Sequence, residues 1–148
     1  MSGPLPAPML EGAALDGDEH GWRPAAFPSC LESAKRFGYA CLGGQFQFRT
    51  RNVTAEMYWQ NADSIGRQPG ERWRAYVVRS CDEVRVGFER IMQQTNWARE
   101  AARWSCVARD LGSGQRPEDV LVFVACFTTE IESRRFEKLA RLQAKRRK

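Results

Sequence analysis

Histidine is almost absent from this chain of 148 residues, because His20 is the only histidine in it. A Ser-His or Cys-His nucleophilic pair would therefore require the segment around His20 to fold back onto the rest of the chain. The five cysteines are odd in number and widely spaced, so neither a disulfide framework nor a zinc site is predicted. Phosphate-binding glycine motifs are missing as well, because neither Gly43-Gly44 nor Gly112-Ser113-Gly114 is followed by the lysine of a P-loop. We predict no catalytic residue, no metal ligand and no cofactor.

Long apolar runs are also missing. The longest run, residues 120–127, has eight residues and is too short to cross a bilayer. The first residues lack the basic and apolar stretches of a secretory signal. Unpaired cysteines are typical of a reducing compartment. We therefore expect a cytoplasmic protein that does not bind membranes.

Acidic residues are missing from the last eleven positions, where the positive charge of the chain is concentrated. The net charge is +5, and the six cations of this tail leave the rest of the chain at about −1. The six are Lys138, Arg141, Lys145, Arg146, Arg147 and Lys148. The tail is the predicted contact for nucleic acid or an acidic partner, and a merely solvated helix end is the alternative.

Composition divides the chain into three parts. Residues 1–28 contain five prolines and four glycines and are expected to be a disordered leader. Residues 29–137 are expected to form one globular domain, whose size suits a single hydrophobic core. Residues 138–148 are expected to form a basic helical tail.

The first half of the globular part predicts a helix and a β-hairpin. A helix over residues 29–37 is indicated by a capping box from Ser29 to Glu32 and by Gly38 as its C-terminal cap. Side chains then alternate between apolar and polar over residues 44–49 and again over residues 53–60, which is typical of half-buried strands. A tight turn between the two runs would join them into a hairpin.

The second half predicts mainly helices. Apolar residues recur at helical spacing over residues 71–94 and again over residues 96–111, with Asn96 as the N-cap of the second helix. A last helix begins after Thr129, which forms a capping box with Glu132.

Residues 120–127 are apolar on both faces and rich in β-branched side chains, which favours a buried central strand. A buried helix remains the alternative, because periodicity does not separate the two in so short a run. The predicted fold is α+β, with a small antiparallel sheet of about three strands (the hairpin and the buried strand) packed by three to four helices.

The best candidate site is a mixture of aromatic and hydrogen-bonding residues that begins at the end of the hairpin's second strand and continues into the segment after it. Tyrosine, tryptophan and arginine are common anchors of protein interfaces. The predicted partner-binding residues are Tyr58, Trp59, Asn61, Asp63, Arg67 and Trp73. Packing of the two tryptophans between hairpin and helix is the alternative for them, whereas Tyr58 lies on the other strand face and is expected to be accessible.

Two functions follow from these observations. The first is a small cytosolic binding or inhibitor protein that acts through protein–protein interaction, as a bacterial toxin-immunity protein or a phage-borne inhibitor does; it is not an enzyme. The second is a nucleic-acid-associated protein that binds phosphates through its tail and its helix arginines. An enzyme that uses carboxylates such as Glu56, Asp63 and Glu71, or a reactive cysteine such as Cys41 or Cys81, is a third possibility.

Overall fold

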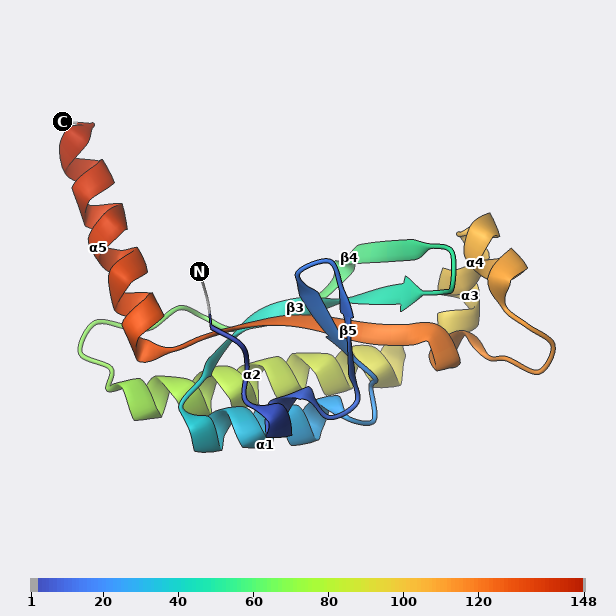
Figure 1. Cartoon of the computed structure of the whole chain (residues 1–148), viewed down its shortest axis with the longest axis horizontal. Coiled ribbons are helices and arrows are strands. Elements are labelled where there is room, and N and C mark those ends of the chain that lie inside the picture. Colours follow the sequence, from blue (N-terminus) through green and yellow to red (C-terminus); the bar gives the residue numbers. More distant parts are fainter. Residues whose placement is uncertain (1–2, 148) are drawn as a thin grey trace.

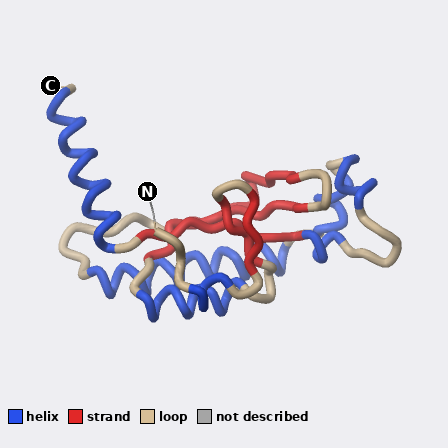
Figure 2. Tube along the Cα trace, viewed as in Figure 1, coloured by secondary structure: helices blue, strands red, loops and turns tan. Residues whose placement is uncertain are grey.

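A computed structural model describes residues 3–147 as an α+β fold built on a five-stranded antiparallel sheet with the order β1-β2-β5-β3-β4 (Figure 1; Figure 2). The strands are β1 (Ala13–Asp16), β2 (Glu19–Trp22), β3 (Ala40–Arg49), β4 (Thr54–Asp63) and β5 (Leu121–Thr128). The α-helices are α1 (Phe27–Phe37), α2 (Trp73–Gln94), α3 (Trp97–Ala102), α4 (Ser105–Asp110) and α5 (Glu130–Arg146). Two short 3₁₀ helices, η1 (Ala7–Leu10) and η2 (Pro117–Val120), complete the fold.

Aromatic side chains fill the core between the sheet and the two helices α1 and α2. Phe46 of β3 and Phe123 of β5 are fully buried, with ring centroids 4.8 Å apart. Phe27 of α1 packs 4.6 Å from Phe123, and Phe88 of α2 packs 5.4 Å from Phe46. Burying each such ring stabilises the fold by roughly 1.5–3 kcal/mol. The other face of the sheet, called the outer face below, is turned away from α1 and α2.

The N-terminal segment, expected from its composition to be a disordered leader, contains regular elements from Ala7 onward. It forms η1 and the hairpin β1–β2, which adds two strands to the three that were predicted. Trp22 and Met9 are both 0% exposed, and the Trp22 indole Nε1 donates to the Met9 carbonyl oxygen at 2.7 Å. Composition alone misses this segment because its few large apolar side chains pack against a core made by distant residues. Residues 1–2 of the predicted leader lie outside the described residues.

Several element boundaries differ from the sequence prediction. Helix α1 begins at Phe27, with Pro28 in its first turn and no side-chain cap, so the capping box predicted at Ser29 is wrong. Its end is confirmed, since Gly38 adopts a left-handed φ of 78°. The predicted helix over 96–111 is divided into α3 and α4 by extended backbone at Trp104.

Other predictions are confirmed. Residues 121–128 form a strand, β5, which excludes the buried-helix alternative. Asn96 caps α3 by accepting the Arg99 backbone N–H at 3.1 Å. Thr129 caps α5 in the same way through the Glu132 N–H at 3.2 Å, which is one half of the predicted capping box.

The sheet curls so that its two edge strands meet. The Thr54 hydroxyl of β4 donates to the Asp16 carboxylate of β1 at 2.8 Å. Beneath this contact, Arg49 of β3 donates to the carbonyl oxygens of Ala14 and Glu19, at 2.8 and 3.2 Å. One end of the outer face is thereby closed, while the other end stays open.

Helix α5 projects from the opposite end of the molecule, on the side of the sheet away from α1 and α2 (Figure 1). None of its described residues is buried. Within residues 3–147, no helix combines the length and the apolar character needed to span a bilayer.

Candidate protein-binding surfaces

A bulge in β4 pushes three residues out of the sheet. Gln45 of β3 pairs with Asn61, but the next residue, Phe46, pairs with Met57. Residues 58–60 therefore have no pairing partner on β3, and the strand bends outward there. Tyr58, on this bulge, is 71% exposed.

Trp59 of the bulge is held by the helices that follow α2. Its indole Nε1 donates to the carboxylate of Glu100 of α3 at 3.2 Å, and Glu100 is itself only 8% exposed. The Trp104 ring lies parallel to it, with centroids 6.4 Å apart. The guanidinium of Arg103 lies 5.9 Å from the Trp59 ring centroid, within cation–π range.

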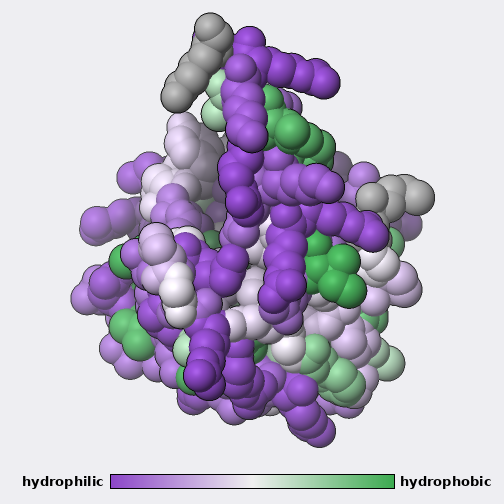
Figure 3. All heavy atoms as spheres, turned by 90° about the vertical axis from the view of Figure 1, so that its left-hand side faces the viewer, coloured by the Kyte–Doolittle hydropathy of each residue, from purple (hydrophilic) through white to green (hydrophobic). Residues whose placement is uncertain are grey.

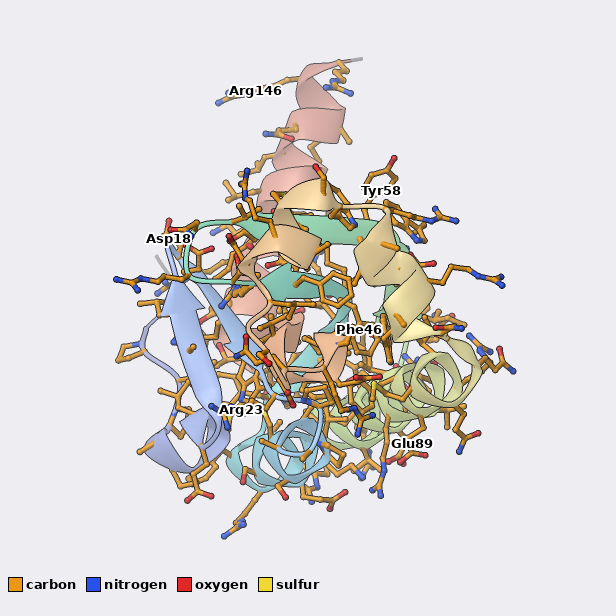
Figure 4. All side chains as sticks on the ribbon, turned by 90° about the vertical axis from the view of Figure 1, so that its right-hand side faces the viewer. Asp18, Arg23, Phe46, Tyr58, Glu89 and Arg146 are labelled. Carbon is orange, nitrogen blue, oxygen red and sulfur yellow. The ribbon has the colours of Figure 1, made fainter. Side chains whose placement is uncertain are left out.

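These contacts join four side chains into a connected group, here called the aromatic ridge: Tyr58, Trp59, Arg103 and Trp104. The Tyr58 ring meets Trp59 edge-on at 5.1 Å, so the exposed phenol rests on a side chain that is itself hydrogen-bonded. Tyr58 lies on the upper surface in the view of Figure 4, on the opposite side from Asp18 of the β1–β2 turn. The ridge is therefore exposed and conformationally restricted.

Next to the ridge, the open end of the outer face forms a cleft of about 510 Å³, called the outer cleft. Its lining residues are Glu19, Leu42, Gly43, Gly44, Gln45, Tyr58, Asn61, Asp63, Val124 and Cys126. Two glycines are among them: a Cβ on Gly43 would stand 2.2 Å from the Asp63 carboxylate, whereas one on Gly44 would stand 2.7 Å from the core ring of Phe123. The lining includes two carboxylates, Glu19 and Asp63, and neither lysine nor arginine.

The thiol of Cys126 at this cleft is not activated. Partial burial raises its pKa, and the neighbouring Glu19 raises it further, so the thiol stays protonated near neutral pH. The buried thiols of Cys30 and Cys81 have pKa values raised by desolvation to about 12 and about 11. Burial also raises the pKa of Cys41. None of these four thiols has the lowered pKa of a nucleophile.

The other reactive groups proposed from the sequence, the carboxylates, either form ion pairs or lie apart from one another. Glu71 is bound by Arg79 and by the Gln68 backbone N–H, which lower its pKa from 4.5 to about 2 and leave it ionised near neutral pH. Within residues 3–147, His, Cys, Asp and Glu side chains do not gather in any group of three or more that would hold a metal ion.

The structure places four of the six predicted binding residues on these two surfaces. Tyr58 and Trp59 lie on the aromatic ridge, and Tyr58, Asn61 and Asp63 line the outer cleft. Arg67 instead donates to both carboxylate oxygens of Glu137, midway along α5, at 3.0 and 3.1 Å.

Trp73 is a packing residue. Its indole Nε1 donates to the Gly38 carbonyl oxygen at 2.9 Å, and its ring meets Tyr76 edge-on. Sequence reasoning missed Glu19, Arg103 and Trp104 at the two surfaces. These residues come from segments distant in the chain, and only the tertiary fold brings them near the bulge.

The predicted basic tail lies along α5. Lys138, Arg141 and Lys145 line a groove of about 740 Å³ together with Arg67, Arg134, Glu137, Leu142 and Ala144. Viewed from this end, hydrophilic side chains run along the projecting helix with hydrophobic atoms beside them (Figure 3). Arg146 lies near the free end of the helix in Figure 4, Arg147 follows it as the C-cap, and Lys148 lies outside the described residues.

The arginines of α2 are less available to phosphate than those of α5. Arg79 pairs with Glu83 at 2.6 Å, and Arg85 pairs with Glu89 at 3.0 Å, as the helical spacing predicts. Glu71 and Arg74, although three residues apart, do not pair with each other, because Glu71 binds Arg79 and Arg74 donates to the Lys35 carbonyl oxygen.

Comparison with protein-family models, with characterised proteins and with solved structures finds no match for this chain.

Proposed function

We propose that this chain is a small binding protein that acts by covering a surface of a protein partner, as a toxin-immunity protein or a phage-borne inhibitor does. The observation that carries the proposal is the β4 bulge, which presents Tyr58 at 71% exposure on top of the anchored Trp59. A bulge of this kind redirects side chains away from the sheet at a functional surface.

The composition and rigidity of the ridge support this role. Tryptophan, tyrosine and arginine are enriched among interface residues whose truncation costs the most binding energy. The Glu100 hydrogen bond and the parallel Trp104 ring already restrain Trp59, so little side-chain entropy remains to be lost on binding. The ridge therefore resembles a preorganised anchor more than a solvated strand edge.

Photo-crosslinking in the native host tests the proposal. A photoreactive phenylalanine analogue at position 58 is expected to capture one defined protein, whereas the same analogue at position 86 is not. Val86 is 63% exposed on α2 and is a matched control for accessibility.

The captured protein is then titrated with variants of the ridge. The double variant Tyr58→Ala/Arg103→Ala is expected to weaken binding about 30-fold or more, the effect of losing about 2 kcal/mol at hot-spot residues. The control Val86→Ala/Arg90→Ala on α2 is expected to leave the affinity unchanged. Equal losses in the two double variants would mean that the ridge is not the contact surface.

Nucleic-acid binding through the tail is the second candidate, supported by the α5 groove, whose lining has five cationic side chains and one carboxylate. Phosphate-driven affinity falls steeply with salt, by about one log unit per log unit of salt for each phosphate contacted. Truncation after Leu139 is expected to abolish such binding, whereas a partner held by the aromatic ridge is retained. Binding of duplex or single-stranded oligonucleotides that survives the truncation would reject the tail as the site.

A further inference from the structure

Helix α5 has an apolar face that nothing in residues 3–147 covers. Ile131, Phe136, Leu139 and Leu142 are between 47% and 74% exposed. The helix has 17 residues and is about 25 Å long at 1.5 Å per residue. Helices of about this length gain most of their stability from packing of an amphipathic face. An exposed row of large apolar side chains on such a helix marks a surface that is buried in a complex.

The outer cleft has the complementary chemistry. Leu42, which is 46% exposed, supplies apolar surface; Val124 also lines the cleft but is only 6% exposed. Glu19 and Asp63 supply negative charge without any lining cation. The C-terminal half of α5 carries Lys138, Arg141 and Lys145 beside Leu139 and Leu142. A basic amphipathic helix and an acidic, partly apolar cleft therefore occur on one chain.

The helix is directed away from the cleft of its own chain. The pair between Arg67 and Glu137 holds the middle of α5 against the loop that precedes α2. From there α5 extends on the outer-face side of the sheet and leaves the body (Figure 1). A second copy that turns its outer face toward the first would meet this helix.

We propose that α5 of each chain packs into the outer cleft of a second copy, giving a two-fold symmetric dimer. A two-fold axis makes both contacts identical, so the arrangement closes at two chains and covers both helices at once. The apolar face of α5 contacts Leu42 and Val124, and the cations of its C-terminal half lie near Glu19 and Asp63. Opposite charges at these positions favour the packing of each α5 into the cleft of the other chain, and they fix the register of this contact.

This dimer is a property of the chain alone and goes beyond the proposed function. It is measured on purified protein without any partner, so its failure leaves the crosslinking experiment unaffected. Tyr58 belongs to both the outer cleft and the aromatic ridge. Self-association and partner binding are therefore expected to compete.

Sedimentation velocity of the full chain over a wide concentration range tests the dimer. Two charge-reversal variants test the two surfaces of the proposed contact separately. The cleft variant is Glu19→Lys/Asp63→Lys, and the helix variant is Lys138→Glu/Arg141→Glu. None of these four side chains makes a hydrogen bond or ion pair within residues 3–147, so both variants are expected to keep the native far-UV and near-UV circular dichroism. The control, Glu11→Lys/Glu89→Lys, makes the same charge change as the cleft variant on the side of α1 and α2, where it also removes the exposed pair of Glu89 with Arg85.

The wild type and the control are expected to dimerise, while each charge-reversal variant alone sediments as a monomer. An equimolar mixture of the two variants is expected to restore the dimer, because each reversed cleft then meets a reversed helix. A wild type that stays monomeric at every concentration overturns the proposal. A cleft variant that dimerises like the wild type, or a mixture that stays monomeric, would show that α5 pairs with something other than the outer cleft.

Discussion

At the scale of single residues, Arg79 joins a loop to the first turns of α2. Its guanidinium donates to both carboxylate oxygens of Glu71, at 2.7 and 2.8 Å, and to Glu83. It also donates to the carbonyl oxygens of Ile65 and Gly66. The contacts with Ile65, Gly66 and Glu71 fix the loop that leads from β4 into α2, whereas the pair with Glu83 lies within the helix. Planar, bidentate pairing of this kind is specific to arginine and is not reproduced by lysine.

The pKa of Glu71 leads to a prediction about acid stability. Arg79 lowers it from 4.5 to about 2, so the pair stabilises the fold fully above pH 4.5, and this contribution is lost as the pH falls toward 2. We expect Glu71→Gln to reduce the urea midpoint of unfolding at neutral pH, and the difference from the wild type to shrink steadily between pH 4.5 and about pH 2.

The matched control is Glu56→Gln, which removes an exposed carboxylate of β4 that makes no ion pair within residues 3–147. Its unfolding midpoint is expected to follow the wild type across the same pH range. A constant difference between Glu71→Gln and the wild type at all pH values would mean that the pair with Arg79 does not shift the pKa of Glu71.

At the scale of elements, the β1–β2 hairpin depends on a strand that follows it in the sequence. Arg49 of β3 reaches under it to two of its backbone carbonyls, and its Nε donates to the side chain of the fully buried Gln47 at 3.3 Å. The Gln47 amide nitrogen finds no hydrogen-bond acceptor among the described residues. The closed end of the outer face is thus a polar cluster with Arg49 at its centre.

Replacing Arg49 with methionine tests this role, because methionine keeps an unbranched stem and loses all three hydrogen bonds. We expect Arg49→Met to lower the free energy of unfolding by about 1.5–3 kcal/mol, the range for hydrogen bonds to a charged group. Amide hydrogen exchange of β1 and β2 should rise more than that of β5. Arg51→Met, at an exposed turn position, is expected to change neither quantity. An equal effect of both substitutions would contradict the proposed role of Arg49 in holding the β1–β2 hairpin.

At the scale of the whole molecule, the chain consists of a packed body and a projecting helix. The body contains every buried hydrophobic residue among those described, and α5 contributes none. The Arg67–Glu137 pair, with side chains 28% and 34% exposed, is the charged contact between them. Partly exposed pairs of this kind contribute little, about 0–1 kcal/mol.

Truncation after Thr129 is therefore expected to leave a folded body. Its free energy of unfolding in urea, measured at a protein concentration where the full chain is monomeric, should lie within about 1 kcal/mol of the full-length value. Loss of cooperative unfolding in the truncated chain would show that α5 belongs to the folding unit. If the reciprocal dimer forms, only the full-length chain should become more stable as its concentration rises.

Prediction from the sequence succeeded where a local pattern was strong. The long amphipathic α2, the buried strand β5 and the Thr129 cap each have a signal within a few residues, either a period or a capping pair. It failed for the β1–β2 hairpin, whose four-residue strands carry little periodicity. At the candidate site, Tyr58 was correctly expected to be exposed, but Arg67 and Trp73 do not belong with it.

Local sequence by itself determined the main helices, the central strands, the accessibility of Tyr58 and the concentration of positive charge in the tail. These properties follow from side-chain periodicity, capping chemistry and the order of charges. Only the tertiary structure decided that the N-terminal segment completes the sheet, that Trp104 lies against Trp59, and that Glu19 shares a cleft with Asp63. These contacts join residues far apart in the chain, and their formation depends on the core that brings the segments together.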